Sequence, residues 1–222
     1  MRGSGLLHCS RGGGGDTPRF SGDRCELLIV LIGLPGSGKS TVGRQLARRL
    51  QLPFVDSDQT IEKRLGCSIR EYFEREGEES FRAVEETVLD ELTSLASGVL
   101  STGGGSVLRP ANRQHLRERG HVVYLRSSPD ELFRRLRHDV NRPLLQVPDP
   151  LGRLRDLYTV RDPLYRETAH FVIETGRPSV ATLVNMIVMQ LELAGVLPLP
   201  PIPPIPPIPP VSQTPPPLLP GS

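Results

Sequence analysis

The sequence predicts an α/β protein with a parallel β-sheet and helices on both faces of it. An uninterrupted apolar run at 27–32 is typical of a strand buried on both sides. Strand and helix patterns then alternate as far as about residue 196, and a glycine-rich loop joins the first strand to the first helix. Such alternation favours a sheet built from βαβ units.

The first unit covers residues 27–50. After the apolar run, Val42, Leu46 and Leu50 recur every four residues, which indicates one face of a helix. The second unit begins with a short strand at 54–55. Ser68 and Glu71 have the spacing of a capping box, so a helix should begin there. Beyond Gly77 apolar residues return at helical spacing, and a long helix is expected.

Three further strands are expected at 99–100, 122–125 and 171–173. Ser128 and Glu131 mark the start of a helix after the second of these strands. Apolar spacing predicts another helix from Leu151, and Pro163 is expected to end it. The closing helix should stop near Gly195.

Composition divides the 222 residues into three zones: a glycine- and arginine-containing extension at 1–24, a globular domain at 25–196 and a proline-rich tail at 197–222. Both ends are expected to be disordered. The extension carries four arginines and two aspartates, which accounts for the formal charge of +2, and the tail carries no charge. The central domain is therefore neutral, which argues against nucleic acid or a membrane surface as its main partner.

The proline tail repeats Pro-Ile-Pro with a period of three, which matches the three residues per turn of a polyproline II helix. Ile202, Ile205 and Ile208 would then form one apolar edge, a strip for weak docking on a partner. The alternative is a solvated extension without a partner.

Cysteine usage and hydropathy indicate a cytoplasmic protein. Cys9, Cys25 and Cys67 are odd in number and widely spaced, so they form neither a disulfide framework nor a zinc pattern. The apolar runs are shorter than the roughly 20 residues that a membrane span needs, and the first residues lack the apolar core of a secretory signal.

Residues 33–40, GLPGSGKS, match the phosphate-binding pattern G-x-x-x-x-G-K-[ST]. The context is also right, because an apolar strand enters the loop and an amphipathic helix leaves it. Lys39 can reach the β- and γ-phosphates of ATP, and the Ser40 hydroxyl can bind Mg²⁺. The chain has only two lysines among its 27 basic residues, and one of them is in this motif. Nucleotide binding is predicted.

Further polar residues suggest a small acceptor. Asp56 and Asp58 follow the second strand, at the sheet edge where ligands bind in such folds. One carboxylate can hold magnesium through water and the other can accept a proton from a hydroxyl. A helix N-cap is the alternative for this segment. The glycines at 103–105 permit close approach of a ligand, or form a flexible turn.

Three arginines complete this set. Arg82 lies near the buried face of its helix, where either a structural carboxylate or a substrate could be its partner. Arg161 projects inward from its own helix. Arg142 lies in a loop at about 137–149, as expected of a lid that closes over the phosphates. A substrate with one carboxylate and several hydroxyls would suit these residues.

Together these motifs resemble those of shikimate kinases. The resemblance covers nearly all of 27–193 and rests on motifs that occur in the family's order: GLPGSGKST at 33–41, DSD at 56–58, FR at 81–82, TGGG at 102–105, RPLL at 142–145 and RDPLY at 161–165. It implies a three-layer P-loop fold with a five-stranded parallel sheet and a mobile lid. It also implies transfer of the γ-phosphate of ATP to the 3-hydroxyl of shikimate, with Mg²⁺ as cofactor, in the pathway to chorismate and aromatic amino acids.

The resemblance further implies a role for each matching residue. Lys39, Asp58 and Arg142 would be catalytic, and Asp56 and Ser40 would hold the magnesium, Asp56 through water. Shikimate would contact Asp58, Arg82, Gly104 and Arg161. ATP would contact Gly36, Ser37, Gly38, Lys39, Ser40, Thr41, Arg135, Arg142 and Arg177. We expect a monomer whose partners are shikimate and ATP.

Two other functions compete with this one. Gluconate kinase, or another small-metabolite kinase of the same fold, would share the phosphate loop but should not combine the glycine turn with RDPLY. A non-catalytic relative acting through the proline tail should have lost Lys39, Asp58 or Arg142, and all three are present. A regulatory GTPase is disfavoured because the N-K-x-D motif does not occur.

Overall fold

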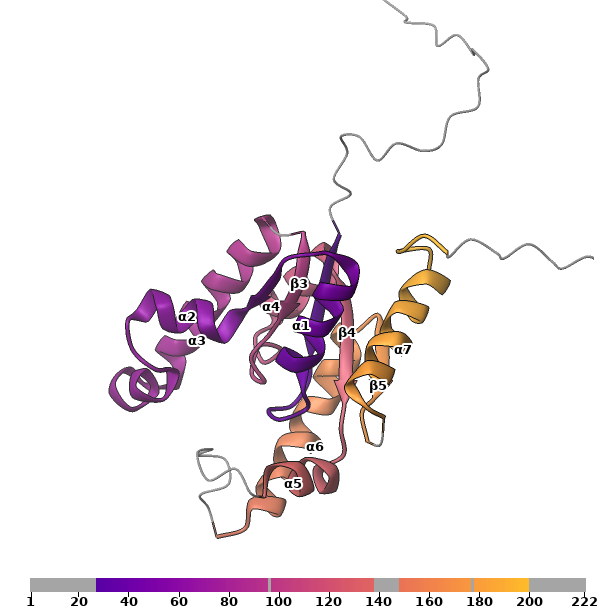
Figure 1. Ribbon diagram of the computed structural model, residues 1–222. Coiled ribbons are helices and arrows are strands. Elements are labelled where there is room, and N and C mark those ends of the chain that lie inside the picture. The colour runs from indigo at the N-terminus through magenta and orange to yellow at the C-terminus, as the bar shows by residue number, and fades with distance from the viewer. Residues whose placement is uncertain (1–26, 96, 138–147, 177, 200–222) are drawn as a thin grey trace, which may run out of the picture.

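The computed structural model describes residues 27–95, 97–137, 148–176 and 178–199 (Figure 1). Its sheet has five parallel strands in the order β2-β3-β1-β4-β5. The strands are β1 (Leu28–Ile32), β2 (Phe54–Asp56), β3 (Gly98–Ser101), β4 (His121–Arg126) and β5 (Phe171–Glu174). The helices are α1 (Lys39–Leu50), α2 (Ser57–Leu65), α3 (Ile69–Leu95), α4 (Pro110–Arg119), α5 (Pro129–Leu136), α6 (Pro150–Thr168) and α7 (Val180–Leu193).

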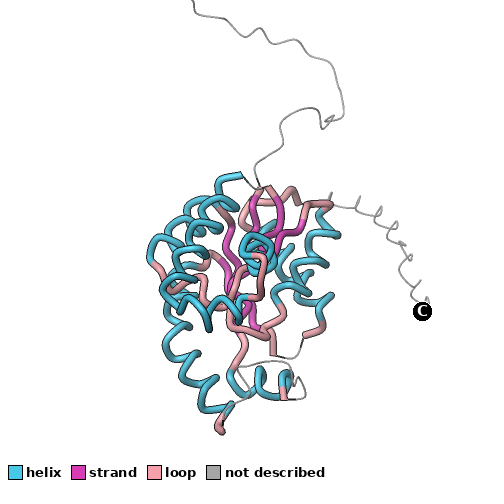
Figure 2. Tube along the Cα trace, turned by 90° about the vertical axis from the view of Figure 1, so that its left-hand side faces the viewer, coloured by secondary structure: helices cyan, strands magenta, loops and turns pink. Residues whose placement is uncertain are grey.

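Helices cover the sheet on both sides and make three layers (Figures 1 and 2). The central strand β1 is wholly buried because its side chains alternate between two cores. Ile29 and Leu31 pack with residues of α1 and α7. Val30 and Ile32 pack with residues of α3, α4 and α6. The run is continuously apolar because the strand is buried on both faces, as predicted. The predicted α/β fold with a five-stranded parallel sheet is confirmed.

A smaller apolar cluster joins α2 to the first part of α3, which lie together to one side of the sheet (Figure 1). Ile61 and Phe81 are its buried anchors. Gly77, with φ 81° and ψ 173°, interrupts α3, so that the helix predicted beyond it is a separate segment. The predicted capping box before α3 is formed: Glu71 accepts from the Ser68 N–H at 2.8 Å and donates its own N–H to the Ser68 hydroxyl at 3.2 Å.

The prediction that Pro163 ends its helix was wrong, since α6 continues to Thr168. A proline inside a helix removes one backbone hydrogen bond and costs about 3 kcal/mol. Here the residues beyond it are held by tertiary contacts. Tyr165 is fully buried, and Arg117 donates to the carbonyls of Glu167 and Ala169 at the end of the helix, both at 3.0 Å. Packing outweighs the local penalty.

Two helices, α2 and α4, were not predicted. Each buries few apolar side chains: Ile61 is the buried hydrophobe of α2 and Leu116 that of α4. A periodic stripe cannot be recognised from so few positions. None of the helices in the described part of the chain is long and apolar enough to cross a membrane.

Candidate active site

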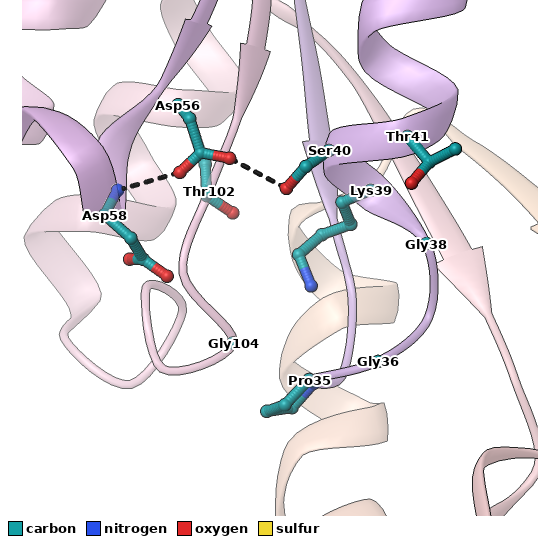
Figure 3. A pocket seen from close by; sticks show the side chains of 10 residues that line it. All are labelled: Pro35, Gly36, Gly38, Lys39, Ser40, Thr41, Asp56, Asp58, Thr102 and Gly104. Carbon is teal, nitrogen blue, oxygen red and sulfur yellow. Dashed lines mark hydrogen bonds between the residues drawn. The ribbon is translucent and has the colours of Figure 1, made fainter. Parts of the chain in front are cut away.

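A cavity of about 450 Å³ opens at the carboxyl ends of β1, β2 and β3 (Figure 3). It lies between the loop that follows β1 and the glycine turn that follows β3. Its lining residues are Pro35, Gly36, Gly38, Lys39, Ser40, Thr41, Asp56, Asp58, Thr102 and Gly104. The phosphate loop and the DSD segment, 15 residues apart in sequence, thus line one cavity, as the parallel sheet predicts.

The loop after β1 is shaped to bind an anion. Gly38 adopts a left-handed conformation, with φ 94°, and is the N-cap of α1. The first N–H groups of α1 and the positive end of its dipole therefore face the cavity. Lys39 is 7% exposed, and its Nζ donates to the carbonyls of Gly33 and Leu34, both at 2.9 Å. These bonds hold the ammonium group inside the curve of the loop.

Two oxygen groups across the cavity suit a magnesium ion. The Ser40 hydroxyl donates to Asp56 Oδ2 at 2.7 Å (Figure 3). It also lies 3.3 Å from the Ser101 hydroxyl. Mg²⁺ prefers oxygen ligands and usually takes only one or two from the protein, the rest being water and phosphate. The described residues contain no cluster of three or more His, Cys, Asp or Glu that could hold a metal. A hydroxyl with one carboxylate fits this mode of binding.

Asp56 also caps a helix. Its Oδ1 accepts from the Asp58 N–H at 3.1 Å, which starts α2. The N-cap that was the alternative interpretation of this segment is therefore real, and the same carboxylate uses its other oxygen toward Ser40. One residue both caps the helix and lines the cavity.

Asp58 points into the cavity from the first turn of α2 (Figure 3). Burial, together with the neighbouring charge of Asp56, raises the pKa of Asp58 from 3.8 to about 6, although Lys39 acts in the opposite direction. A carboxylate with such a pKa is ionised at neutral pH and is a better proton acceptor than an exposed one. Asp58 is the strongest candidate for a general base in this cavity.

The three glycines after β3 each face a different site residue. A Cβ on Gly103 would lie 2.5 Å from Asp58 Oδ1, and a Cβ on Gly104 would lie 2.6 Å from Pro35 Cδ. A Cβ on Gly105 would collide with the guanidinium of Arg82. The turn needs glycine because its backbone packs directly against these side chains.

Arg82 is largely buried and is paired within its own helix. Its guanidinium donates to Glu85 at 2.7 Å and to Glu78 at 2.9 Å. The Glu78 side chain is 63% exposed, whereas that of Glu85 is 2% exposed. Burial raises the pKa of Glu85, although the charge of Arg82 opposes this. The structural ion pair that was one of the two interpretations of Arg82 is therefore present, and its Glu78 half is open to solvent.

Arg161 approaches the same turn from α6. Its guanidinium donates to the Gly104 carbonyl at 2.9 Å, and the Tyr165 hydroxyl donates to the same carbonyl at 2.5 Å. Arg82 and Arg161 thus both contact the glycine turn, although neither lines the cavity itself.

Comparison with known proteins identifies the family. The profile described as shikimate kinase matches residues 35–192, which is more than half of the chain. The chain belongs to the shikimate kinase family. Its matching region lies within the domain predicted at 25–196.

Named members of the shikimate kinase family are close in sequence. Shikimate kinase of Paracidovorax citrulli is 64% identical over 176 residues, which cover 78% of this chain and 96% of that protein. The Ralstonia nicotianae enzyme is 59% identical over 169 residues, which cover 76% of this chain and 89% of that protein. Shikimate kinase from Acinetobacter baumannii, solved in complex with shikimate, superposes with a TM-score of 0.73 at 47% identity, covering 78% of this chain and 96% of that one.

Within this shikimate kinase fold, most of the predicted site residues meet at one place. Eight of the predicted residues line the cavity: Gly36, Gly38, Lys39, Ser40, Thr41, Asp56, Asp58 and Gly104. Ser37 does not line it, because its hydroxyl is buried. Arg135 lies outside the cavity and donates to the Thr175 carbonyl. Arg142, the predicted lid and Arg177 lie outside the described residues.

Sequence reasoning missed Pro35 and Thr102, which line the cavity. It also missed two residues that share contacts with the predicted arginines, Glu85 with Arg82 and Tyr165 with Arg161. Glu85 lies three residues after Arg82, and Tyr165 lies four residues after Arg161. These spacings place each on the same helix face as its arginine. The spacing could have indicated both residues once the arginines had been selected.

Proposed function

We propose that this chain transfers the γ-phosphate of ATP to the 3-hydroxyl of shikimate, and that the residues of the cavity divide this work between two sides. The observation that carries the proposal is the placement of Asp58. It lies in one cavity with the phosphate loop, next to a glycine turn that two arginines contact.

The nucleotide side consists of the loop and its lysine. The N–H groups around Gly36 and Gly38 would hold the phosphates, and Thr41, which lines the same wall, would contact them. Lys39 would turn its ammonium from the Gly33 and Leu34 carbonyls toward the β- and γ-phosphates. That charge offsets the negative charge that develops during transfer.

Magnesium would be held by Ser40 directly and by Asp56 through water. When bound, the ion would neutralise the β- and γ-phosphate oxygens. Ser40 donates to Asp56 at 2.7 Å, and its oxygen could offer a lone pair to the cation while the hydrogen still bonds to the carboxylate.

Asp58 would orient the attacking hydroxyl and accept its proton. The new bond forms between the 3-oxygen of shikimate and the γ-phosphorus, and the bond between that phosphorus and the β,γ-bridging oxygen breaks. ADP leaves with the electron pair of the broken bond, and the hydroxyl proton passes to the Asp58 carboxylate. The raised pKa of about 6 suits this acceptor at neutral pH.

The carboxylate of shikimate would be bound by Arg82 and Arg161. Arg82 can exchange the solvent-exposed Glu78 for the substrate carboxylate while its bond to buried Glu85 holds the guanidinium in place. Arg161 has five N–H donors and needs only one of them for the Gly104 carbonyl.

Three more arginines would complete the nucleotide site. We assign Arg142 to the closing lid, as a donor to the phosphates during transfer. Arg135 and Arg177 would lie against the adenine. Arg135 is on α5, whose Leu136 packs against Gly36 of the phosphate loop, and this supports a place for the helix beside a bound nucleotide.

The experiment that tests this function is ADP release by the purified chain with Mg·ATP, comparing shikimate, gluconate, quinate and no acceptor. Release that depends on shikimate supports the proposal, and loss of the release on chelation supports the role of magnesium. Activity on gluconate or quinate alone would contradict the acceptor assignment. If the chain binds ATP but releases no ADP with any acceptor, the proposed phosphoryl transfer would be contradicted.

A further inference from the structure

The Gly104 carbonyl is tied to another element in a way that its neighbours are not. The Gly103 and Gly105 carbonyls accept from N–H groups inside the turn, those of Ser106 at 3.2 Å and Leu108 at 3.0 Å. The Gly104 carbonyl instead accepts from two side chains of α6. Its position therefore depends on the placement of that helix.

The Tyr165 hydroxyl is the better fixed of these two donors. Tyr165 is fully buried, and its ring stacks on Tyr124 of β4 with centroids 4.9 Å apart. Burial also raises the pKa of Tyr165, so its hydroxyl keeps its proton and stays a donor. The guanidinium of Arg161, in contrast, is carried on a long flexible side chain, and it would also have to bind the substrate.

The other side of Gly104 is fixed as well. Its Cα lies so close to Pro35 that a Cβ would be 2.6 Å from the proline ring. The peptide is therefore held between the phosphate loop and α6. When Arg161 shifts toward a carboxylate, the Tyr165 hydroxyl is the contact from α6 that can still hold the carbonyl.

We propose that Tyr165 is a positioning residue for the acceptor: its hydroxyl fixes the Gly104 peptide, and thereby the cavity wall against which shikimate binds. The inference rests on the proposed function. It predicts an effect on the acceptor and none on the nucleotide, because the phosphate loop is held by its own bonds to Lys39.

The test is Tyr165→Phe, which removes one hydroxyl and keeps the stacked ring. We expect the KM for shikimate to rise about 3- to 10-fold, the effect of one lost hydrogen bond, with the KM for ATP unchanged within twofold. Hydrogen exchange should also become faster in the segment 102–108 of the ligand-free protein. This second measurement needs no turnover.

The matched control is Tyr124→Phe. Tyr124 is equally buried and belongs to the same stacked pair, but its hydroxyl donates to Asp162 at 2.8 Å, away from the cavity. A general loss of stability should appear in both variants as a lower melting temperature. Only Tyr165→Phe should change the KM for shikimate and the exchange of 102–108.

An unchanged KM for shikimate in folded Tyr165→Phe would overturn the inference, as would an equal change for both substrates or in both variants. Faster exchange at 102–108 in both variants would overturn it too. These results are distinct from failure of the proposed function, which would appear as an inactive wild-type chain with shikimate.

Discussion

The two sides of the cavity are built in different ways. The phosphate-binding part of the nucleotide side comes from one continuous segment, 33–41, whose shape is set by its own glycines and by the bonds from Lys39 to Gly33 and Leu34. The acceptor side is assembled from four separate segments of α2, α3, the glycine turn and α6. Its parts are held by contacts between elements, such as those of Arg161 and Tyr165 with Gly104.

This difference explains why one side can bind phosphate in many proteins while the other can select a particular acceptor. A local loop keeps its geometry wherever a strand and helix support it, which is why the motif predicts phosphate binding in general. A composite surface depends on how helices pack, so its geometry can distinguish one acceptor from another. The nucleotide side should therefore control turnover, and the acceptor side should control which acid is used.

Replacing Lys39 tests the nucleotide side and should have the largest effect. In Lys39→Ala we expect turnover to fall about 10³-fold, since a preorganised charge on the transferred group is lost. The control is Lys63→Ala, which removes the other lysine of the chain from an exposed position on α2 and should leave turnover within twofold. A Lys39→Ala enzyme with more than a tenth of the normal rate would contradict the assigned role.

Replacing Asp58 tests the point where the two sides meet. In Asp58→Asn turnover should fall at least about 10²-fold, because the amide cannot accept the proton. Affinity for ATP should change little. Asp130→Asn is a matched control, because Asp130 is exposed on α5 and pairs with Arg155. Normal turnover in folded Asp58→Asn would show that Asp58 is not the proton acceptor.

Replacing Arg82 separates acceptor binding from nucleotide binding. In Arg82→Lys we expect the KM for shikimate to rise about 10- to 100-fold, because a point charge cannot replace a planar fork that bonds Glu85 and would bind the substrate at the same time. The KM for ATP should stay within twofold. Arg109→Lys, which alters the neighbouring pair with Glu86, is the control. Equal weakening of both substrates would show that the two sides are not separable.

The pH dependence should be the smallest of these effects near neutrality. With a pKa of about 6, Asp58 becomes protonated as the pH falls through 6, and only the ionised form accepts a proton. The kcat/KM for shikimate should therefore fall about tenfold per pH unit below 6. A flat profile down to pH 5 in the stable wild-type enzyme would contradict the role of the carboxylate.

The same pKa shift affects stability with a defined sign. Because the pKa of Asp58 is higher in the folded state than in the unfolded chain, ionising it costs folding free energy as the pH rises from about 4 to 6. Asp58→Asn should therefore melt at a higher temperature than wild type at pH 7, and the difference should shrink toward pH 4. A lower melting temperature at pH 7 would contradict this sign.

The two sides also differ in how far the sequence could predict them. The strand, glycine loop and helix of the nucleotide side are contiguous, so their arrangement follows from local patterns. The DSD segment was placed correctly because parallel strands end at one sheet edge. The dual role of Asp56, as helix cap and cavity wall, follows from its position at the end of β2.

The acceptor side could be predicted only in part. Arg82 and Arg161 were identified, but the sequence did not show that Glu85 pairs with one and that Tyr165 shares a carbonyl with the other. These contacts depend on the packing of α3 and α6 against the glycine turn. The error at Pro163 has the same origin, because burial of Tyr165 continues the helix that local propensity would end.

The proposed acceptor side should recognise a carboxylate independently of the nucleotide. The most direct measurement compares shikimate with its methyl ester as acceptors for the wild-type chain under saturating Mg·ATP. We expect kcat/KM to be at least about 10²-fold lower for the ester, since it loses charged hydrogen bonds to both arginines, while the KM for ATP stays the same. Use of the ester within tenfold of shikimate would contradict recognition of the carboxylate by Arg82 and Arg161.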